Sequence, residues 1–260
     1  MTPAGLELDI IGVPLLAGLL VVATHVPLGR EVLRRGIIFI DLAVAQIAGL
    51  GVIAALALGW DAGGWQTQGI AVGSALLGAL LIHSFERYWP EIQEALIGIT
   101  FVMAATGGLL LLAGNPHGAE HLSDLLAGQL LWVGVDQLIV IALAYLPVLL
   151  VWYWLGPGRM RFYLLFAVTV TASVQLVGVF LVFSSLIIPA VVIHRMQGIA
   201  AIATGYGLGA TAFAGGLMCS LWFDWPAGPT VVWMLALLGM VLGIVIGKLN
   251  SDLHHSSTRG

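Results

Sequence analysis

The chain is built from long runs of apolar residues separated by short polar segments. A helix needs about 20 apolar residues to span the hydrocarbon of a bilayer. One continuous apolar block, 162–194, is too long for a single ordinary crossing, and we divide it at Gly178, near its middle. The pattern then predicts nine transmembrane helices, at 10–28, 37–60, 69–85, 95–113, 137–155, 162–177, 178–194, 198–223 and 227–247.

Composition agrees with this pattern. Of the 260 residues, 60% are hydrophobic and 8% are charged, whereas soluble domains carry about 25% charged residues. The sequence therefore excludes a soluble globular protein. We expect an all-α integral membrane protein, a single domain over residues 1–260, in contact with membrane lipid in the cell inner (plasma) membrane. We expect no nucleic-acid partner.

The basic residues indicate how the helices are oriented. Lysine and arginine are enriched in cytoplasmic loops, and all nine basic residues of the chain fall on one side of the predicted membrane. The opening MTPAGLELD lacks the basic residues of a signal peptide, so we expect it to belong to the mature protein. The orientation rests on the basic residues alone. We therefore expect the N-terminus outside and the C-terminus inside, with these inside segments: 29–36, 86–94, 156–161, 195–197 and the C-terminal tail.

Polar residues inside the predicted membrane are candidates for the translocation path, because such residues are costly there. Asp41 and Gln46 lie on the second predicted helix and Gln175 on the sixth. Asp41 has an alternative interpretation, as an interfacial residue paired with Arg34 or Arg35. Gln46 could also serve only in hydrogen bonds between helices.

The predicted outside loop GNPHGAEHLSD holds the densest group of metal-binding side chain types. His117, Glu120, His121 and Asp124 could offer two imidazoles and two carboxylates to a divalent metal. A solvated acidic loop is the alternative. The His117–His121 spacing also matches a metalloprotease pattern, but that pattern requires a sheltered helix and this loop is rich in glycine and proline. No nucleotide-binding glycine motif is present, so ATP hydrolysis would need a partner.

Several segments, in order, resemble the zinc/manganese/iron permeases of ABC transporters and, more remotely, the vitamin B12 and siderophore permeases. The resemblance extends over about residues 20–247, and WPAGPTVV before the last helix is its most specific part. The segments that carry it are Pro27–Gly29, Arg34–Arg35, Ala45–Val52, Glu94–Ile99, Leu126–Leu131, Val177–Ala190 and Trp225–Val232.

The resemblance implies a homodimeric permease subunit without enzymatic activity or bound cofactor of its own. It would receive a metal from an extracytoplasmic binding protein and be driven by cytoplasmic ATP-binding cassette ATPase subunits. In this family the second helix carries an Asp followed four residues later by a His. The matching positions here are Leu42 and Gln46, with Asp41 one place early, so neither metal ligand is present.

The family also has a cytoplasmic coupling helix between its fifth and sixth crossings, and here only residues 155–161 are available for it. Segment 83–94, the largest inside loop, is the best substitute. We therefore expect Tyr88 and Trp89, together with Arg159 and Arg161, to contact the ATPase.

The sequence thus predicts a permease importing a divalent transition metal by alternating access, with zinc first among zinc, manganese and iron. A permease for a non-metal or chelated substrate is the main alternative. A non-transporting membrane scaffold and an intramembrane metalloenzyme are the others.

Overall fold

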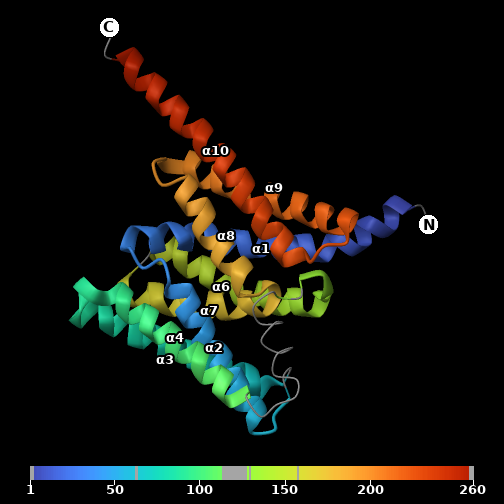
Figure 1. Ribbon diagram of the computed structural model, residues 1–260, viewed down its shortest axis with the longest axis vertical. Helices are drawn as coiled ribbons and strands as arrows, with labels where there is room; N and C mark the ends of the chain where they lie inside the picture. Colours follow the sequence, from blue (N-terminus) through green and yellow to red (C-terminus); the bar gives the residue numbers. More distant parts are fainter. Residues whose placement is uncertain (1–2, 62–63, 113–127, 129, 157, 258–260) are drawn as a thin grey trace.

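The computed structural model describes residues 3–61, 64–112, 128, 130–156 and 158–257, and in this part of the chain it is helical, with no strand (Figure 1). Two 3₁₀ turns, η1 (Pro90–Ile92) and η2 (Leu130–Trp132), accompany the α-helices. The α-helices are α1 (Pro3–Arg35), α2 (Ile40–Ala57), α3 (Trp65–Tyr88), α4 (Gln93–Leu112), α6 (Val135–Leu155), α7 (Arg159–Val177), α8 (Val179–Val192), α9 (Gly198–Phe223) and α10 (Ala227–Ser257).

The helices confirm the predicted all-α polytopic membrane fold. Eight helices in the described residues are long and apolar enough to cross a membrane. The ninth, α8, has 14 residues, which corresponds to about 21 Å of helix and is shorter than the roughly 30 Å of bilayer hydrocarbon. The orientation of the termini stays a prediction.

The division of the 162–194 block falls at the predicted glycine. Gly178 lies between α7 and α8 with φ 79°, a conformation that residues with a Cβ rarely adopt. Gly128 packs on this junction, and a Cβ there would overlap the backbone of Val177. Two segments far apart in sequence therefore meet where the long apolar block breaks.

The helices pack in two connected groups. In one, α2 contacts α3, α4 and α7, and in the other α1 contacts α8 and α9, which both pack on α10. Helices α6 and α7 join α1 to the first group. Helix α10 continues past the other helices towards the C-terminus (Figure 1). Glycine allows the closest approach, because a Cβ on Gly29 of α1 would overlap the carbonyl oxygen of Leu186 on α8.

A proline inside α1 creates a specific tie to α9. Pro27 has no N–H, so the carbonyl of Ala23 one turn earlier loses its helical partner. The hydroxyl of Tyr206 on α9 donates to this carbonyl at 3.1 Å. The Tyr206 hydroxyl also pairs with that of Tyr153 on α6 at 3.0 Å. The freed carbonyl is therefore satisfied by a contact that connects α1, α6 and α9.

Candidate functional site

Asp41 lies in the first turn of α2 and is 1% exposed. Neither of its carboxylate oxygens has a hydrogen-bond partner among the described residues. A buried charge without a partner is strongly unfavourable. Asp41 is therefore a buried carboxyl group whose charged form no described side chain stabilises.

The arginines considered as partners of Asp41 bind Glu31 instead. Arg34 donates to the Glu31 carboxylate through Nε at 2.8 Å and Nη2 at 2.6 Å, and Arg35 donates through Nε at 2.7 Å. Spacings of three and four residues place these groups on one face of α1. The alternative in which an arginine neutralises Asp41 is therefore not the arrangement observed.

Glu94 supplies a second carboxylate at the same end of α2. Its Oε1 accepts the backbone N–H of Phe39, the residue that caps α2, at 3.2 Å. Its Oε2 is buried without a partner among the described residues. A helix N-terminus offers only about half a positive charge, so two ionised carboxylates here require a further cation or a proton.

The two glutamines of the predicted path lie in different surroundings. Gln46 is five residues after Asp41, about 7.5 Å further along α2. It lines a narrow crevice that α4 and the α7–α8 junction complete, with Ala104 and Val174 among the lining residues. Gln175, near the end of α7, is exposed and is absent from this crevice. Asp41 and Gln46 thus share α2, whereas Gln175 is separate from them.

An ionic cluster joins the ends of α1 and α3 to the start of α7. Arg35 bonds Glu31 and reaches Glu86 of α3 at 3.3 Å, and Arg159 of α7 lies 3.7 Å from the same Glu86. The Arg35 guanidinium also lies 4.5 Å from the ring centroid of Phe162, a cation–π distance. These helix ends therefore lie on one face of the molecule, as expected if they share one side of the membrane.

The predicted ATPase contacts lie at the end of α3 and the start of α7, the two helix ends that Glu86 and Arg159 connect. Tyr88 and Trp89 are 63% and 53% exposed at the end of α3, with ring centroids 5.9 Å apart. Arg161 donates to the carbonyl of Leu155 at 2.9 Å. Helix α6 ends at Leu155 and α7 begins at Arg159, so the connection has room for no coupling helix.

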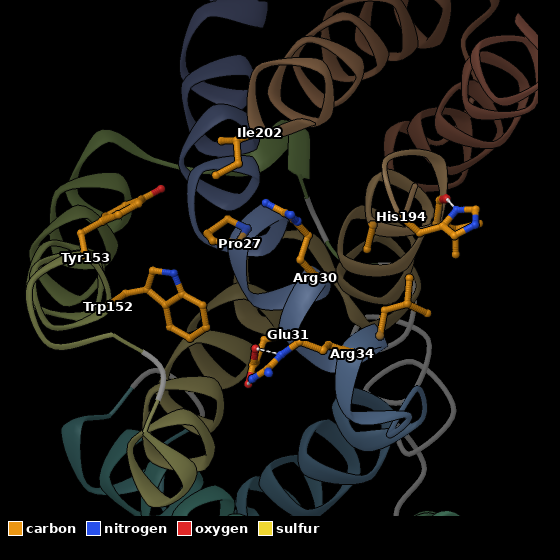
Figure 2. Close-up of a pocket in the computed structure, with 11 residues that line it drawn as sticks. Pro27, Arg30, Glu31, Arg34, Trp152, Tyr153, His194 and Ile202 are labelled. Carbon is orange, nitrogen blue, oxygen red and sulfur yellow. Dashed lines mark hydrogen bonds and ion pairs between the residues drawn. The ribbon is translucent and has the colours of Figure 1, made fainter. Parts of the chain in front are cut away.

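A cavity of about 630 Å³ opens beside the ionic cluster, among the ends of α1, α6 and α8 and the start of α9. Figure 2 shows Trp152 and Tyr153 of α6 on one side and His194 on the other, with the α1 residues between them. The residues lining it are Pro27, Arg30, Glu31, Leu33, Arg34, Trp152, Tyr153, Ala190, Val191, His194 and Ile202.

Sequence reasoning missed Glu94 and the cavity. Glu94 was considered only as part of the family-like segment Glu94–Ile99. An acidic residue at the start of an apolar run could itself have indicated a functional carboxylate. Nothing in the sequence indicated that Arg30 and His194 line a common space. The predicted loop ligands His117, Glu120, His121 and Asp124 lie outside the described residues. Within the described residues, no three His, Cys, Asp or Glu side chains gather closely enough to hold a metal.

Comparison with known proteins identifies the family. PsaBC from Streptococcus pneumoniae, solved in complex with Fab, superposes with a TM-score of 0.70 at 23% identity, covering 90% of each chain. A structure described as an inward-facing metal-chelate type ABC transporter superposes with a TM-score of 0.61 at 16% identity, covering 93% of this chain and 89% of the other. The sequence matches the ABC 3 transport family over residues 7–156 and 157–246. The protein is therefore a multi-pass membrane protein of the ABC 3 transport family.

Proposed function

We propose that the protein is the permease subunit of an importer for a divalent transition metal. The observation that carries this proposal is two carboxylates at one end of α2, the buried Asp41 and the half-buried Glu94, each with oxygens that lack a partner among the described residues. Their unpartnered oxygens are ligands of the type that divalent metals use. Gln46 lies further along α2 and lines a separate narrow crevice, which does not include Asp41 or Glu94.

The donor set suits passage of a metal more than its storage. Two carboxylates leave most of the coordination sphere to water or backbone oxygens, so affinity at this point should be low. Zinc is the first candidate among the substrates. Zinc is placed first because of the family resemblance. Manganese is the second candidate, and the donor set itself favours it, because carboxylate and water oxygens suit manganese whereas zinc also takes imidazole.

The permease would act as a homodimer by alternating access, with the metal delivered by an extracytoplasmic binding protein. Separate ATPase subunits would hydrolyse ATP, and segment 83–94 would transmit their movement through Tyr88 and Trp89. The connection between α6 and α7 has three residues, too few for a coupling helix that could dock on the ATPase. This supports the assignment of the coupling role to segment 83–94. Arg159 and Arg161 lie at the start of α7 and would add charged contacts.

A chelated substrate is the second candidate function. Leu42 and Gln46 replace the Asp and His of the related metal permeases, and one structural neighbour is described as a metal-chelate type transporter. A chelate brings its own metal ligands, so its path would need no strong protein ligand. Competition between free and chelated metal in uptake measurements would separate the two candidates.

Metal uptake by cells expressing the permease with its ATPase and binding protein tests the proposal. Asp41→Asn and Glu94→Gln should each lower uptake about tenfold or more, the scale on which metal sites respond to altered ligation. Asp136→Asn is the matched control, because Asp136 is an exposed acid in the first turn of α6, outside segment 83–94. Uptake of zinc, manganese and iron by the wild type that equals uptake by a deletion strain would exclude metal import.

A second pair of variants tests the outside loop. If His117, Glu120, His121 and Asp124 assist capture, the double variant His117→Ala/His121→Ala should lower uptake mainly at limiting metal. Ordering the glycine-rich loop around an ion costs entropy, so the effect should be smaller than that of Asp41→Asn. Loss of uptake in Asp41→Asn alone would assign the site to the membrane path.

A further inference from the structure

The cavity beside the ionic cluster combines a charged mouth with apolar walls. Pro27 and Arg34 are seven residues apart on α1, so the lining extends about 10 Å along that helix. The inner part is apolar, with Pro27, Ala190 and Ile202 among its walls. Its volume of about 630 Å³ falls within the range of ligand sites.

The mouth carries excess positive charge. Arg30 lines it, and none of the described carboxylates forms an ion pair with it. Arg34 uses Nε and Nη2 on Glu31, which leaves other N–H groups free. Glu31 is the one carboxylate of the lining and is bound by both Arg34 and Arg35. The unbalanced charge therefore favours an anion at the cavity mouth.

Aromatic residues and the neighbouring histidine define the rest of the rim. Trp152 and Tyr153 lie in the last turn of α6 (Figure 2), where such residues mark the interface of a membrane. His194 donates from Nδ1 to the Val191 carbonyl at 2.6 Å and accepts from Arg195 Nε at 3.1 Å. Arg195 thus adds a further cation next to the rim.

We propose that this cavity binds an anionic phospholipid, with its phosphate between Arg30 and Arg34 and an acyl chain along Pro27, Val191 and Ile202. Basic pockets between transmembrane helices on the cytoplasmic side are suited to acidic headgroups. The unpaired positive charge favours an anionic headgroup, and the apolar walls, which belong to helices long and apolar enough to span a membrane or adjoin them, favour an acyl chain. The site is separate from Asp41 and Glu94, so it does not depend on the transported substrate.

Binding of phosphatidylglycerol to the purified full-length protein tests the proposal. Native mass spectrometry and thermal unfolding would compare it with phosphatidylcholine and with inorganic phosphate. Phosphatidylglycerol should bind more tightly than phosphatidylcholine and raise the melting temperature more. Arg30→Gln should weaken phosphatidylglycerol binding about fivefold, the contribution of one arginine near an anionic lipid. Arg30→Lys should retain most of the binding.

Two further variants separate the cavity from general surface charge. Arg87→Gln removes an exposed arginine at the end of α3, outside the cavity, and should leave binding within about twofold of the wild-type value. Ile202→Phe fills the apolar part without changing charge and should weaken binding of the lipid. If Arg30→Gln fails to fold, Arg30→Lys still tests the need for positive charge, and Ile202→Phe still tests the need for the apolar part of the cavity.

Three results would overturn the proposal. Equal affinity for phosphatidylglycerol and phosphatidylcholine would exclude charge recognition. Equal losses in Arg30→Gln and Arg87→Gln would assign binding to diffuse surface charge. Stabilisation by inorganic phosphate as large as that by phosphatidylglycerol would assign the arginines to a free anion.

Discussion

Replacing Asp41 by asparagine should stabilise the protein in the absence of metal while it impairs metal import. Asp41 is 1% exposed and its two oxygens lack hydrogen-bond partners among the described residues. Asparagine has nearly the same shape, carries no charge and brings an N–H₂ group. Repulsion between two neighbouring carboxylates is removed at the same time.

The size of the effect follows from the burial. An unpartnered buried polar group costs about 1–3 kcal/mol and a charged group costs more. Asparagine keeps the polar group and removes the charge, so Asp41→Asn should raise the free energy of unfolding by the difference, on the order of 1 kcal/mol or more. For a chain of this size the melting temperature should rise by about 2–4 °C per kcal/mol. The wild type should in turn gain about 2.7 kcal/mol when metal is present at about 100 times its dissociation constant. Asp41→Asn should gain much less.

Thermal unfolding of the purified protein, with and without zinc or manganese, measures both effects. Glu91→Gln is the control, because it removes an exposed acid and should alter neither value. A lower melting temperature for metal-free Asp41→Asn would mean that Asp41 is already neutralised favourably. Equal stabilisation of the variant and the wild type by metal would exclude Asp41 as a ligand.

Three other predictions address orientation, coupling and the tie at Pro27. Single cysteines at Gly64 and Gly158, in a cysteine-free background, should differ in labelling by an impermeant thiol reagent in intact cells; equal labelling would refute the orientation. Tyr88→Ala with Trp89→Ala should uncouple ATP hydrolysis from transport in a folded protein, whereas unchanged transport and ATPase stimulation would assign both rings to the membrane interface. Tyr206→Phe removes an interhelical hydrogen bond and should lower the free energy of unfolding, measured by chemical denaturation, by about 0.6 kcal/mol, the average for such bonds in a membrane protein. An unchanged free energy of unfolding would mean that the Ala23 carbonyl needs no partner.

Most of the helices could be predicted from the local sequence. A membrane requires each spanning segment to be apolar and to satisfy its own backbone hydrogen bonds. The break at Gly178 was predictable for the same local reason, since a long apolar block must turn where glycine permits it. The short α6–α7 connection could also be read directly from the number of residues between two apolar runs. Ordered motifs such as WPAGPTVV indicated the family that the match over residues 7–156 and 157–246 established.

The candidate site depended on tertiary structure, because its groups come from helices distant in sequence. Asp41 stood out as a buried acid, but its neighbours Arg34 and Arg35 looked like partners until they were seen to bind Glu31. Glu94 accepts a hydrogen bond from the backbone N–H of Phe39, which lies 55 residues earlier in the sequence. Helix periodicity shows which residues share one helix face, but it does not show which faces meet. The apolar pattern of the sequence therefore determined how many helices form, whereas packing between helices decided which charges are paired and which remain free.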